Sequence, residues 1–328
     1  MRHSATLLIG FLLFLLSLSS CRDDFDINTV QSHPKLVLYC MPTVGDTTTI
    51  MLTRSLPVNG RGQVRTIDGA RISYTVNGKP ATILAEGNGR YKAVARQSVG
   101  DRISIAAEAD SLPAVSAQTT ILAPVPLSDA TIREVTVYSD YWEERQYYLQ
   151  LSASFTDPAE TRDYYAVQVK ALQFIQNDGS IHDHPSADYD VDTMSVVSEA
   201  YTESDPVLRK LNSIDYDFGY DDNDYEHFYV FTDDDINGQT YTLHLNVMPH
   251  GSQEDSRYTS PYYFIELYHI TPEFYHFVSS IGSIEKSDLT KAGLSNITPN
   301  VGNVKGGIGM AAGYASAKSI VLHHIYYQ

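Results

Sequence analysis

Apolar and polar residues alternate along most of the chain, which is the pattern of β-strands with one buried and one exposed face. The alternation is clearest in residues 71–76, 147–155, 165–170 and 241–247. Pairs such as Asn77-Gly78 and Asn88-Gly89 separate neighbouring alternating segments, and they are the residues that two-residue hairpin turns favour. The sequence therefore predicts an all-β fold rich in antiparallel hairpins.

One segment near the C-terminal end has the spacing of a helix instead. Thr271 can cap this helix, Pro272 suits its first position, and Gly282 can end it. Apolar side chains recur between them three or four residues apart, at Phe274, Phe277, Val278 and Ile281. We expect one short helix whose apolar stripe packs on a sheet.

A proline-containing connector at residues 123–128 suggests a domain boundary. Residues 35–123 have room for roughly six or seven short strands, as an immunoglobulin-like β-sandwich requires. Residues 124–328 hold longer strands, the helix and a long acidic insertion at about 177–226. We therefore expect an N-terminal immunoglobulin-like sandwich followed by a larger antiparallel β-sandwich or open barrel with one short helix.

The first residues have the layout of a secretory signal. Arg2 precedes the apolar run of residues 7–18, which is shorter than the ~20 residues that span a bilayer. Leu18-Ser-Ser-Cys21 resembles the bacterial lipobox, in which the cysteine receives the lipid. We expect residues 1–20 to be a lipoprotein signal peptide, Cys21 to be lipidated, and residues 21–34 to form a tether.

Acidic residues directly after Cys21 bear on where in the cell envelope the protein is located. Arg22-Asp-Asp24 is similar to the surface-export signal of Bacteroidetes lipoproteins. We expect an outer-membrane lipoprotein that faces the cell exterior.

Charge and cysteine content narrow the classes of function. The chain has 23 Lys and Arg against 40 Asp and Glu, a formal net charge of −17, which argues against nucleic acid as a partner. Its two cysteines are Cys21 and Cys40. Since the lipid uses Cys21, no intrachain disulfide is expected, and Cys40 is expected to be a small buried residue within the apolar run of residues 36–41.

The acidic insertion is the candidate for metal binding. Its carboxylates are hard oxygen donors of the kind that Ca²⁺ prefers, namely Asp215, Asp217, Asp221, Asp222 and Asp224. Their spacing is not that of an EF-hand, and a solvated acidic loop is the alternative. We expect no cofactor beyond weak Ca²⁺ binding.

Tyrosines in and beside the same insertion are the candidate ligand or partner surface: Tyr189, Tyr201, Tyr216, Tyr220 and Tyr225. Aromatic side chains beside acids suit sugars, cationic peptides and protein interfaces. Ordinary strand packing is the alternative, because tyrosine is a common strand residue.

Gly307-Ile-Gly309 with Ala312 formally fits a dinucleotide-binding fingerprint. That fingerprint needs a strand–helix unit after it, and too few residues follow Ala312 to form one. The two glycines instead predict a bulge or close packing of backbones.

Several stretches, taken in order, resemble the domain-of-unknown-function 4249 family of Bacteroidetes outer-membrane lipoproteins. They are Pro34-Lys-Leu-Val-Leu38, Phe155-Thr-Asp-Pro158 with Asp163-Tyr-Tyr165, Phe231-Thr-Asp-Asp-Asp-Ile-Asn-Gly238, Ile270-Thr-Pro-Glu-Phe-Tyr275 and Asn303-Val-Lys-Gly-Gly-Ile-Gly309. The segment Ser295–Asn300 departs from the family pattern. The resemblance implies an all-β lipoprotein of the cell envelope.

Members of this family tend to be encoded beside TonB-dependent outer-membrane receptors, and the resemblance brings no catalytic residues. It implies a non-catalytic accessory of such a receptor in ligand capture or import, held to the membrane by its lipid. A structural or adhesive surface-assembly lipoprotein is the alternative, and an uncharacterised hydrolase is the third class considered.

Overall fold

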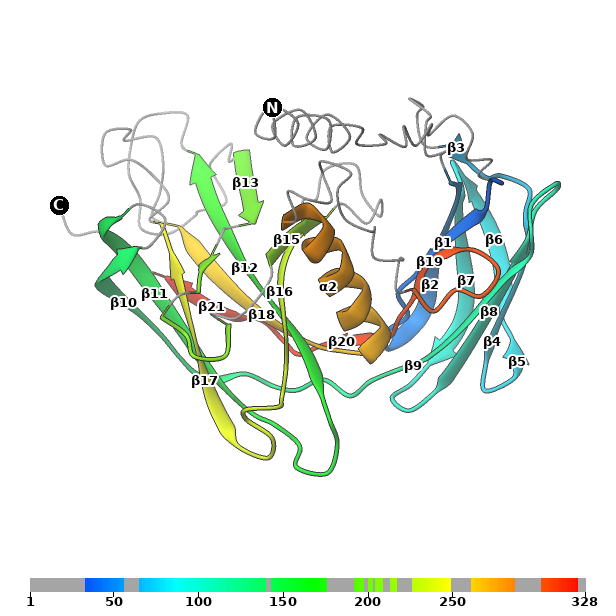
Figure 1. The fold of residues 1–328 in the computed structure, drawn as a ribbon. Helices are drawn as coiled ribbons and strands as arrows, with labels where there is room; N and C mark the ends of the chain where they lie inside the picture. The colour runs from blue at the N-terminus through cyan, green and yellow to red at the C-terminus, as the bar shows by residue number, and fades with distance from the viewer. Residues whose placement is uncertain are drawn as a thin grey trace, which may run out of the picture. The chain divides into compact units, whose positions relative to one another are not determined.

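A computed structural model describes residues 33–55, 65–139, 143–175, 192–197, 200–202, 204–208, 213–216, 226–248, 261–286 and 302–323. The described part of the chain consists mostly of strands, with one helix (Figure 1). The expected all-β fold is therefore confirmed. The expected signal peptide, Cys21 and the tether up to residue 32 lie outside the described residues.

The first sandwich has two sheets, ordered β1-β2-β7-β6 and β5-β4-β8-β9, with β3 pairing to β2. This is the order of strands in immunoglobulin domains, A-B-E-D on one sheet and C′-C-F-G on the other. The strands are β1 (Leu36–Cys40), β2 (Gly45–Arg54), β3 (Arg65–Thr66), β4 (Arg71–Val76), β5 (Lys79–Pro80), β6 (Thr82–Gly87), β7 (Arg90–Gln97), β8 (Arg102–Glu108) and β9 (Val115–Thr120).

Two of its hairpins use the predicted turns. Asn77 and Gly78 join β4 to β5, Asn88 and Gly89 join β6 to β7, and all four residues have positive φ angles, as a type I′ turn requires. The alternating apolar residues of both sheets meet in one core that includes Leu38, Ile50, Tyr74, Tyr91 and Ile105.

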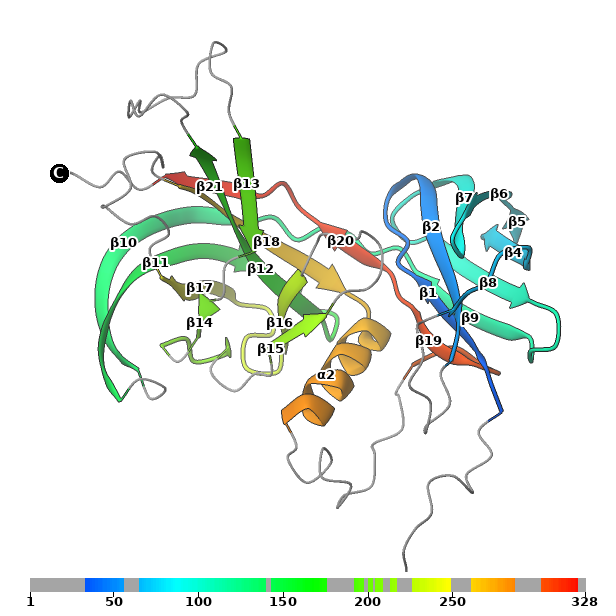
Figure 2. The same ribbon diagram turned by 90° about the horizontal axis from the view of Figure 1, so that it is seen from above.

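A strand from the far end of the chain completes the first sandwich. β19 (Ile308–Ala311) pairs in parallel with β1, with Val37 opposite Ile308 and Cys40 opposite Ala311 (Figure 2). A Cβ atom on Gly309 would lie 2.1 Å from the Leu38 carbonyl oxygen, and one on Gly307 would lie 2.4 Å from that of Leu36. The predicted close approach of backbones at these glycines is confirmed.

The second sandwich also has two sheets, ordered β10-β11-β17-β14 and β15-β16-β12-β18-β20, with β13 on β12 and β21 on β18. The strands are β10 (Ser128–Ser139), β11 (Glu144–Thr156), β12 (Tyr164–Ile175), β13 (Asp192–Val197), β14 (Ala200–Tyr201), β15 (Ser213–Tyr216), β16 (Glu226–Thr232), β17 (Thr240–Val247), β18 (Tyr262–Ile270), β20 (Tyr314–Ser316) and β21 (Ile320–His323). The predicted boundary at residues 123–124 lies between β9 and β10, although β19 crosses it to reach β1.

β12 is buried on both faces, which explains its nearly continuous apolar sequence. Tyr165, Val167 and Val169 point into the core between the two sheets, where they meet residues of β11, β17 and β18. Tyr164 and Ala166 point to the opposite face and belong to a second cluster beneath the helix.

Helix α2 (Pro272–Lys286) packs its apolar stripe on this second face, as predicted (Figure 1). Phe274, Phe277 and Val278 contact the sheet of the second sandwich, and the same cluster includes Met310 of β19 and Tyr39 of β1. The expected end at Gly282 is wrong, since a glycine inside a helix costs only about 1 kcal/mol and the helix continues for four more residues. Within the described residues, no helix is long and apolar enough to cross a membrane.

Three short strands lie in the region expected to be an acidic insertion. β13 pairs with β12, β14 with β17, and β15 with β16, so each extends an existing sheet. The remainder of residues 177–225 lies outside the described residues, apart from short segments around residue 205.

The contact of β19 with β1 predicts a large effect of a single methyl group. Gly309→Ala should lower the free energy of unfolding by about 3 kcal/mol, because its Cβ would collide with the Leu38 backbone and its φ of +111° disfavours alanine. Gly100→Ala is the matched control, with a φ of +86° and open space around its Cβ. Urea denaturation of the full chain should show a clearly smaller loss for the control, and equal losses would contradict the steric account.

Candidate functional site

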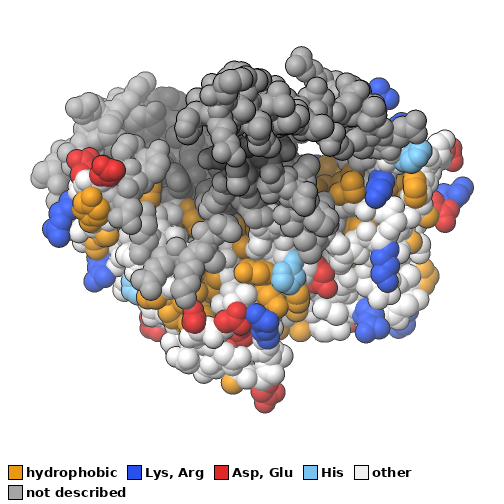
Figure 3. Space-filling model, in the orientation of Figure 1, with side chains coloured by type: hydrophobic (Ala, Val, Ile, Leu, Met, Phe, Trp, Pro, Cys, Tyr) orange, Lys and Arg blue, Asp and Glu red, His pale blue; other side chains and the backbone are white. Residues whose placement is uncertain are grey.

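Two turns lie side by side at one end of the second sandwich, at the bottom of Figure 1. One joins β11 to β12 through residues 157–163, and the other joins β16 to β17 through residues 233–239. Exposed acidic side chains appear at this end of the space-filling view (Figure 3). Three aspartates of these turns, Asp157, Asp163 and Asp233, are buried, and one carboxylate oxygen of each lies within 4.8 Å of the others.

Asp157 joins the two turns. Its Oδ2 accepts the Gly238 N–H at 2.9 Å, and its Oδ1 accepts the Tyr165 hydroxyl at 2.5 Å. Burial, followed by the hydrogen bond and charge of Asp157, raises the pKa of Tyr165, so this phenol stays protonated and donates.

Asp163 forms a pair with His269. The Nδ1 atom of His269 lies 2.9 Å from the Ala123 carbonyl oxygen, which only accepts, so Nδ1 carries a hydrogen. Nε2 lies 3.0 Å from Asp163 Oδ1. The two atoms are therefore within hydrogen-bonding distance of each other. The Asp163 Oδ2 atom accepts the Thr161 hydroxyl at 2.6 Å.

Asp233 has one oxygen in use and one without a partner. Its Oδ2 accepts the Asp163 N–H at 2.8 Å and the Asn237 amide at 3.4 Å. Its Oδ1 is buried and has no hydrogen-bond partner. Burial raises the pKa of Asp233, and the charges of Asp157 and Asp163 raise it further. A carboxylate in this state is uncompensated, and such groups are rare without a function.

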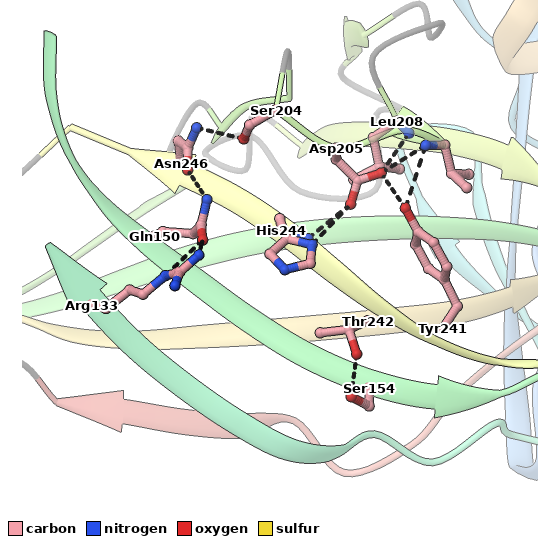
Figure 4. A network of polar contacts seen from close by, with 11 residues as sticks. Arg133, Gln150, Ser154, Ser204, Asp205, Leu208, Tyr241, Thr242, His244 and Asn246 are labelled. Carbon is pink, nitrogen blue, oxygen red and sulfur yellow. Dashed lines mark hydrogen bonds and ion pairs between the residues drawn. The ribbon is translucent and has the colours of Figure 1, made fainter. Parts of the chain in front are cut away.

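Asp205 is a buried aspartate in which both oxygens are satisfied (Figure 4). Oδ1 accepts the N–H groups of Val207 and Leu208 at 2.9 and 2.8 Å and the Tyr241 hydroxyl at 2.8 Å. Oδ2 accepts the His244 N–H at 2.8 Å. Asp205 therefore has the structural role of holding residues 205–208 against β17.

Beside Asp205, a polar chain crosses the outer face of the four-stranded sheet (Figure 4). Arg133 donates to Gln150, Gln150 to Asn246, and Asn246 to Ser204. Each link joins neighbouring strands or the covering segment, so this network also explains stability rather than binding.

A polar cleft of about 420 Å³ lies on the outer face of β4, β8 and β9 in the first sandwich. Its floor consists of outward-facing, mostly small side chains: Ser73, Thr75, Ser104, Ala106, Ser116 and Gln118. Ile105 and Ala117, Glu273 at the start of α2, and Asn303 and Lys305 complete its lining. The volume is typical of ligand sites, and a lining of hydroxyl, amide and charged groups suits a polar ligand.

The 303–305 segment is fixed at the side of this cleft. Lys305 exchanges backbone hydrogen bonds with Ser116 of β9 at 2.8 and 3.1 Å. The Asn303 amide donates to the carbonyls of Gln118 and Ala311, and its Oδ1 accepts the Ala311 N–H at 2.9 Å. The cleft is therefore bounded by backbone that is held in place.

Most residues that the sequence singled out are not covered by the structure. Cys21, Tyr189, Tyr220, Tyr225, Asp217, Asp221, Asp222 and Asp224 lie outside the described residues, and Asp215 and Tyr216 are placed only as part of strand β15. Tyr201 is half-buried, with its ring centroid 5.1 Å from that of Tyr148. The predicted Ca²⁺ and tyrosine surfaces remain predictions.

Cys40 is completely buried in the core of the first sandwich. Burial raises the pKa of its thiol far above the ordinary value, so the thiolate needed for nucleophilic or metal chemistry does not form in the folded protein. Its position agrees with the expected packing role.

The aspartate cluster was missed by reasoning from the sequence, although the chain carries a signal for it. Phe155-Thr-Asp157 and Phe231-Thr-Asp233 are the same tripeptide, and each ends a strand of the second sandwich. The phenylalanines enter one core, with ring centroids 6.2 Å apart, which aligns the two strand ends. Both tripeptides belong to stretches that carry the family resemblance.

The buried Asp205 and the exposed Asp234 are expected to respond differently to mutation. Asp205→Ala should lower the free energy of unfolding by about 3 kcal/mol or more, because it leaves three N–H groups and a hydroxyl without their acceptor. Asp234→Ala is the control, since that carboxylate forms an exposed ion pair with Arg162. Denaturant titrations should show almost no loss for the control, and a similarly small loss for Asp205→Ala would disprove the structural role.

Comparison with known proteins connects these features to a family. No curated protein matches the chain. The model of one protein family, described as a domain of unknown function (DUF4249), matches residues 22–320 and so covers both sandwiches, the cleft and the aspartate cluster. The chain therefore belongs to the DUF4249 family.

Proposed function

We propose that the protein is a lipid-anchored, non-catalytic binding protein of the outer membrane that assists a TonB-dependent receptor in ligand capture or import. The polar cleft on β4, β8 and β9 is the observation that carries this proposal. It offers hydroxyl and amide groups together with one acidic and one basic residue, Glu273 and Lys305, which suits a polar ligand held by hydrogen bonds.

The anchor is supported by the start of the chain. Leu18-Ser-Ser-Cys21 follows an apolar run of signal-peptide length, and the family match begins at Arg22, directly after the proposed lipidated cysteine. A diacylglycerol together with a further acyl chain anchors a protein stably, whereas a single chain does not.

The non-catalytic character is supported by the surroundings of three side chains that could otherwise take part in catalysis. Both ring nitrogens of His269 are engaged, with Ala123 and Asp163, so neither is available to activate a nucleophile. The Cys40 thiol is buried and protonated. Asp205 is saturated by donors from its own fold.

The anchor and its orientation lead to a direct prediction. Cys21→Ala should release the protein from the membrane fraction, and protease added to intact cells should remove the wild-type protein if it faces outward. Cys40→Ala is the matched control, because it removes a thiol that is buried in the fold and should leave the protein in the membrane. Membrane retention of the Cys21 variant would disprove the anchor. Full protection of the wild-type protein from protease in intact cells would disprove the outward-facing location.

The receptor partnership is tested by purifying the protein from detergent-solubilised outer membrane. A stoichiometric complex with a β-barrel receptor is expected, and Ser104→Tyr should reduce ligand-dependent import because it fills the floor of the cleft between Thr75 and Gln118. Thr49→Tyr is the control, at a half-buried outward position on β2 outside the cleft. Recovery with other surface lipoproteins alone would favour the structural or adhesive alternative.

A further inference from the structure

The aspartate cluster carries an excess of negative charge in a buried place. Asp157, Asp163 and Asp233 have exposed fractions of 3%, 6% and 1%. Asp163 has His269 as its partner, whereas no ion pair is found for Asp157 or Asp233 among the described residues. Arg162, which is nearby in sequence, is mostly exposed and pairs with Asp234 instead. Buried charge of this kind needs a counter-charge.

The missing partner is most evident at Asp233. Its Oδ1 is the one carboxylate oxygen in the cluster that is buried without any hydrogen-bond partner. Asp205 shows what this fold does with a buried aspartate whose role is structural, since four donors from its own chain saturate it. Asp233 is built differently, with a free acceptor among other carboxylates.

The spacing and chemistry of the cluster suit a hard cation. One oxygen of each carboxylate lies within 4.8 Å of the others, close enough for one ion to contact all three. Ca²⁺ accepts such oxygens in irregular arrangements, whereas Mg²⁺ demands near-ideal octahedral geometry and keeps several waters. One Ca²⁺ ion would therefore be shared by the three carboxylates and supply the missing counter-charge.

The sequence around Asp233 supports the same ion. Asp233-Asp-Asp235-Ile-Asn237-Gly238 matches the first six positions of a Ca²⁺ loop, D-x-D-x-N-G, and Gly238 has the positive φ of +70° that the sharp turn needs. The twelfth position, where such a loop has a glutamate, is His244. Asp157 and Asp163 of the neighbouring turn supply carboxylates in its place.

We propose that Asp157, Asp163 and Asp233 form a Ca²⁺ site that fastens the β11–β12 turn to the β16–β17 turn. The residues between these aspartates along the chain, 158–162 and 234–235, are exposed, whereas the three aspartates are buried. This site is separate from the acidic stretch at residues 215–224 and from the cleft of the first sandwich. It does not depend on the proposed receptor partnership.

The test measures thermal unfolding of the EDTA-treated full chain with added Ca²⁺. The midpoint should rise by roughly 5 °C when Ca²⁺ is about 100-fold above its Kd, because the ion binds the folded state only. Mg²⁺ at the same concentration should give a smaller rise. No rise with millimolar Ca²⁺, or a larger rise with Mg²⁺, would overturn the assignment.

Asp233→Asn separates an ion site from a purely structural cluster. The amide oxygen can still accept the bonds from Asp163 and Asn237, while the amide removes the uncompensated charge. The variant without Ca²⁺ should therefore unfold at the same temperature as the wild type or higher, yet lose the Ca²⁺ response. An unchanged Ca²⁺ response in this variant would disprove the site.

Two controls and a second measurement complete the design. Asp234→Asn, at the exposed neighbouring position, and Asp222→Asn, in the acidic stretch, should both keep the Ca²⁺ response. Tb³⁺ should bind in place of Ca²⁺ and emit through excitation of Tyr165, whose hydroxyl contacts Asp157. We expect Ca²⁺ to reduce the emission of the wild type by displacing bound Tb³⁺, and Tyr165→Phe to weaken that emission. Emission that Asp157→Asn leaves unchanged would contradict the location of the site.

Discussion

The parallel pairing of β1 with β19 is the contact on which the arrangement of the chain depends. Two glycines allow the strands to approach so closely that a single methyl group would meet a backbone oxygen. The pairing adds a strand to the sheet of the first sandwich and places Met310 and Tyr39 against helix α2. From β19 the chain continues directly to β20 and β21, which pair with β18 of the second sandwich. One strand therefore links the cores of both sandwiches.

Local signals in the sequence account for much of this fold. Alternation marks the strands, the Asn-Gly pairs mark two hairpins, and the spacing around Phe274 marks the helix. Partners far apart in the chain are another matter, because periodicity says which face of a strand is buried but not what covers it. Gly307 and Gly309 indicated close packing of backbones, and only the three-dimensional structure identifies β1 as the partner.

The candidate site shows the same limit more sharply. Carboxylates are frequent along residues 215–224, so the sequence predicts a metal site there. The structure instead gathers two aspartates from one turn and one from another, with five strands between the turns in sequence, and it distinguishes them by their hydrogen bonds. Asp205 and Asp233 are equally buried, yet one is saturated with hydrogen bonds and the other is not. That difference depends on hydrogen-bond donors that tertiary contacts bring to each carboxylate, and the neighbouring residues in the sequence do not reveal these contacts.

The pairing of β1 with β19 also constrains the order in which the parts of the fold can be completed. Val37 emerges from the ribosome long before its partner Ile308 does. The outer edge of β1 therefore remains unpaired while almost the whole chain is produced, and unpaired strand edges invite aggregation. A contact of such long range is formed slowly, since the chain must close a very large loop first. The first sandwich begins the sequence, but it is among the last parts of the molecule to be completed.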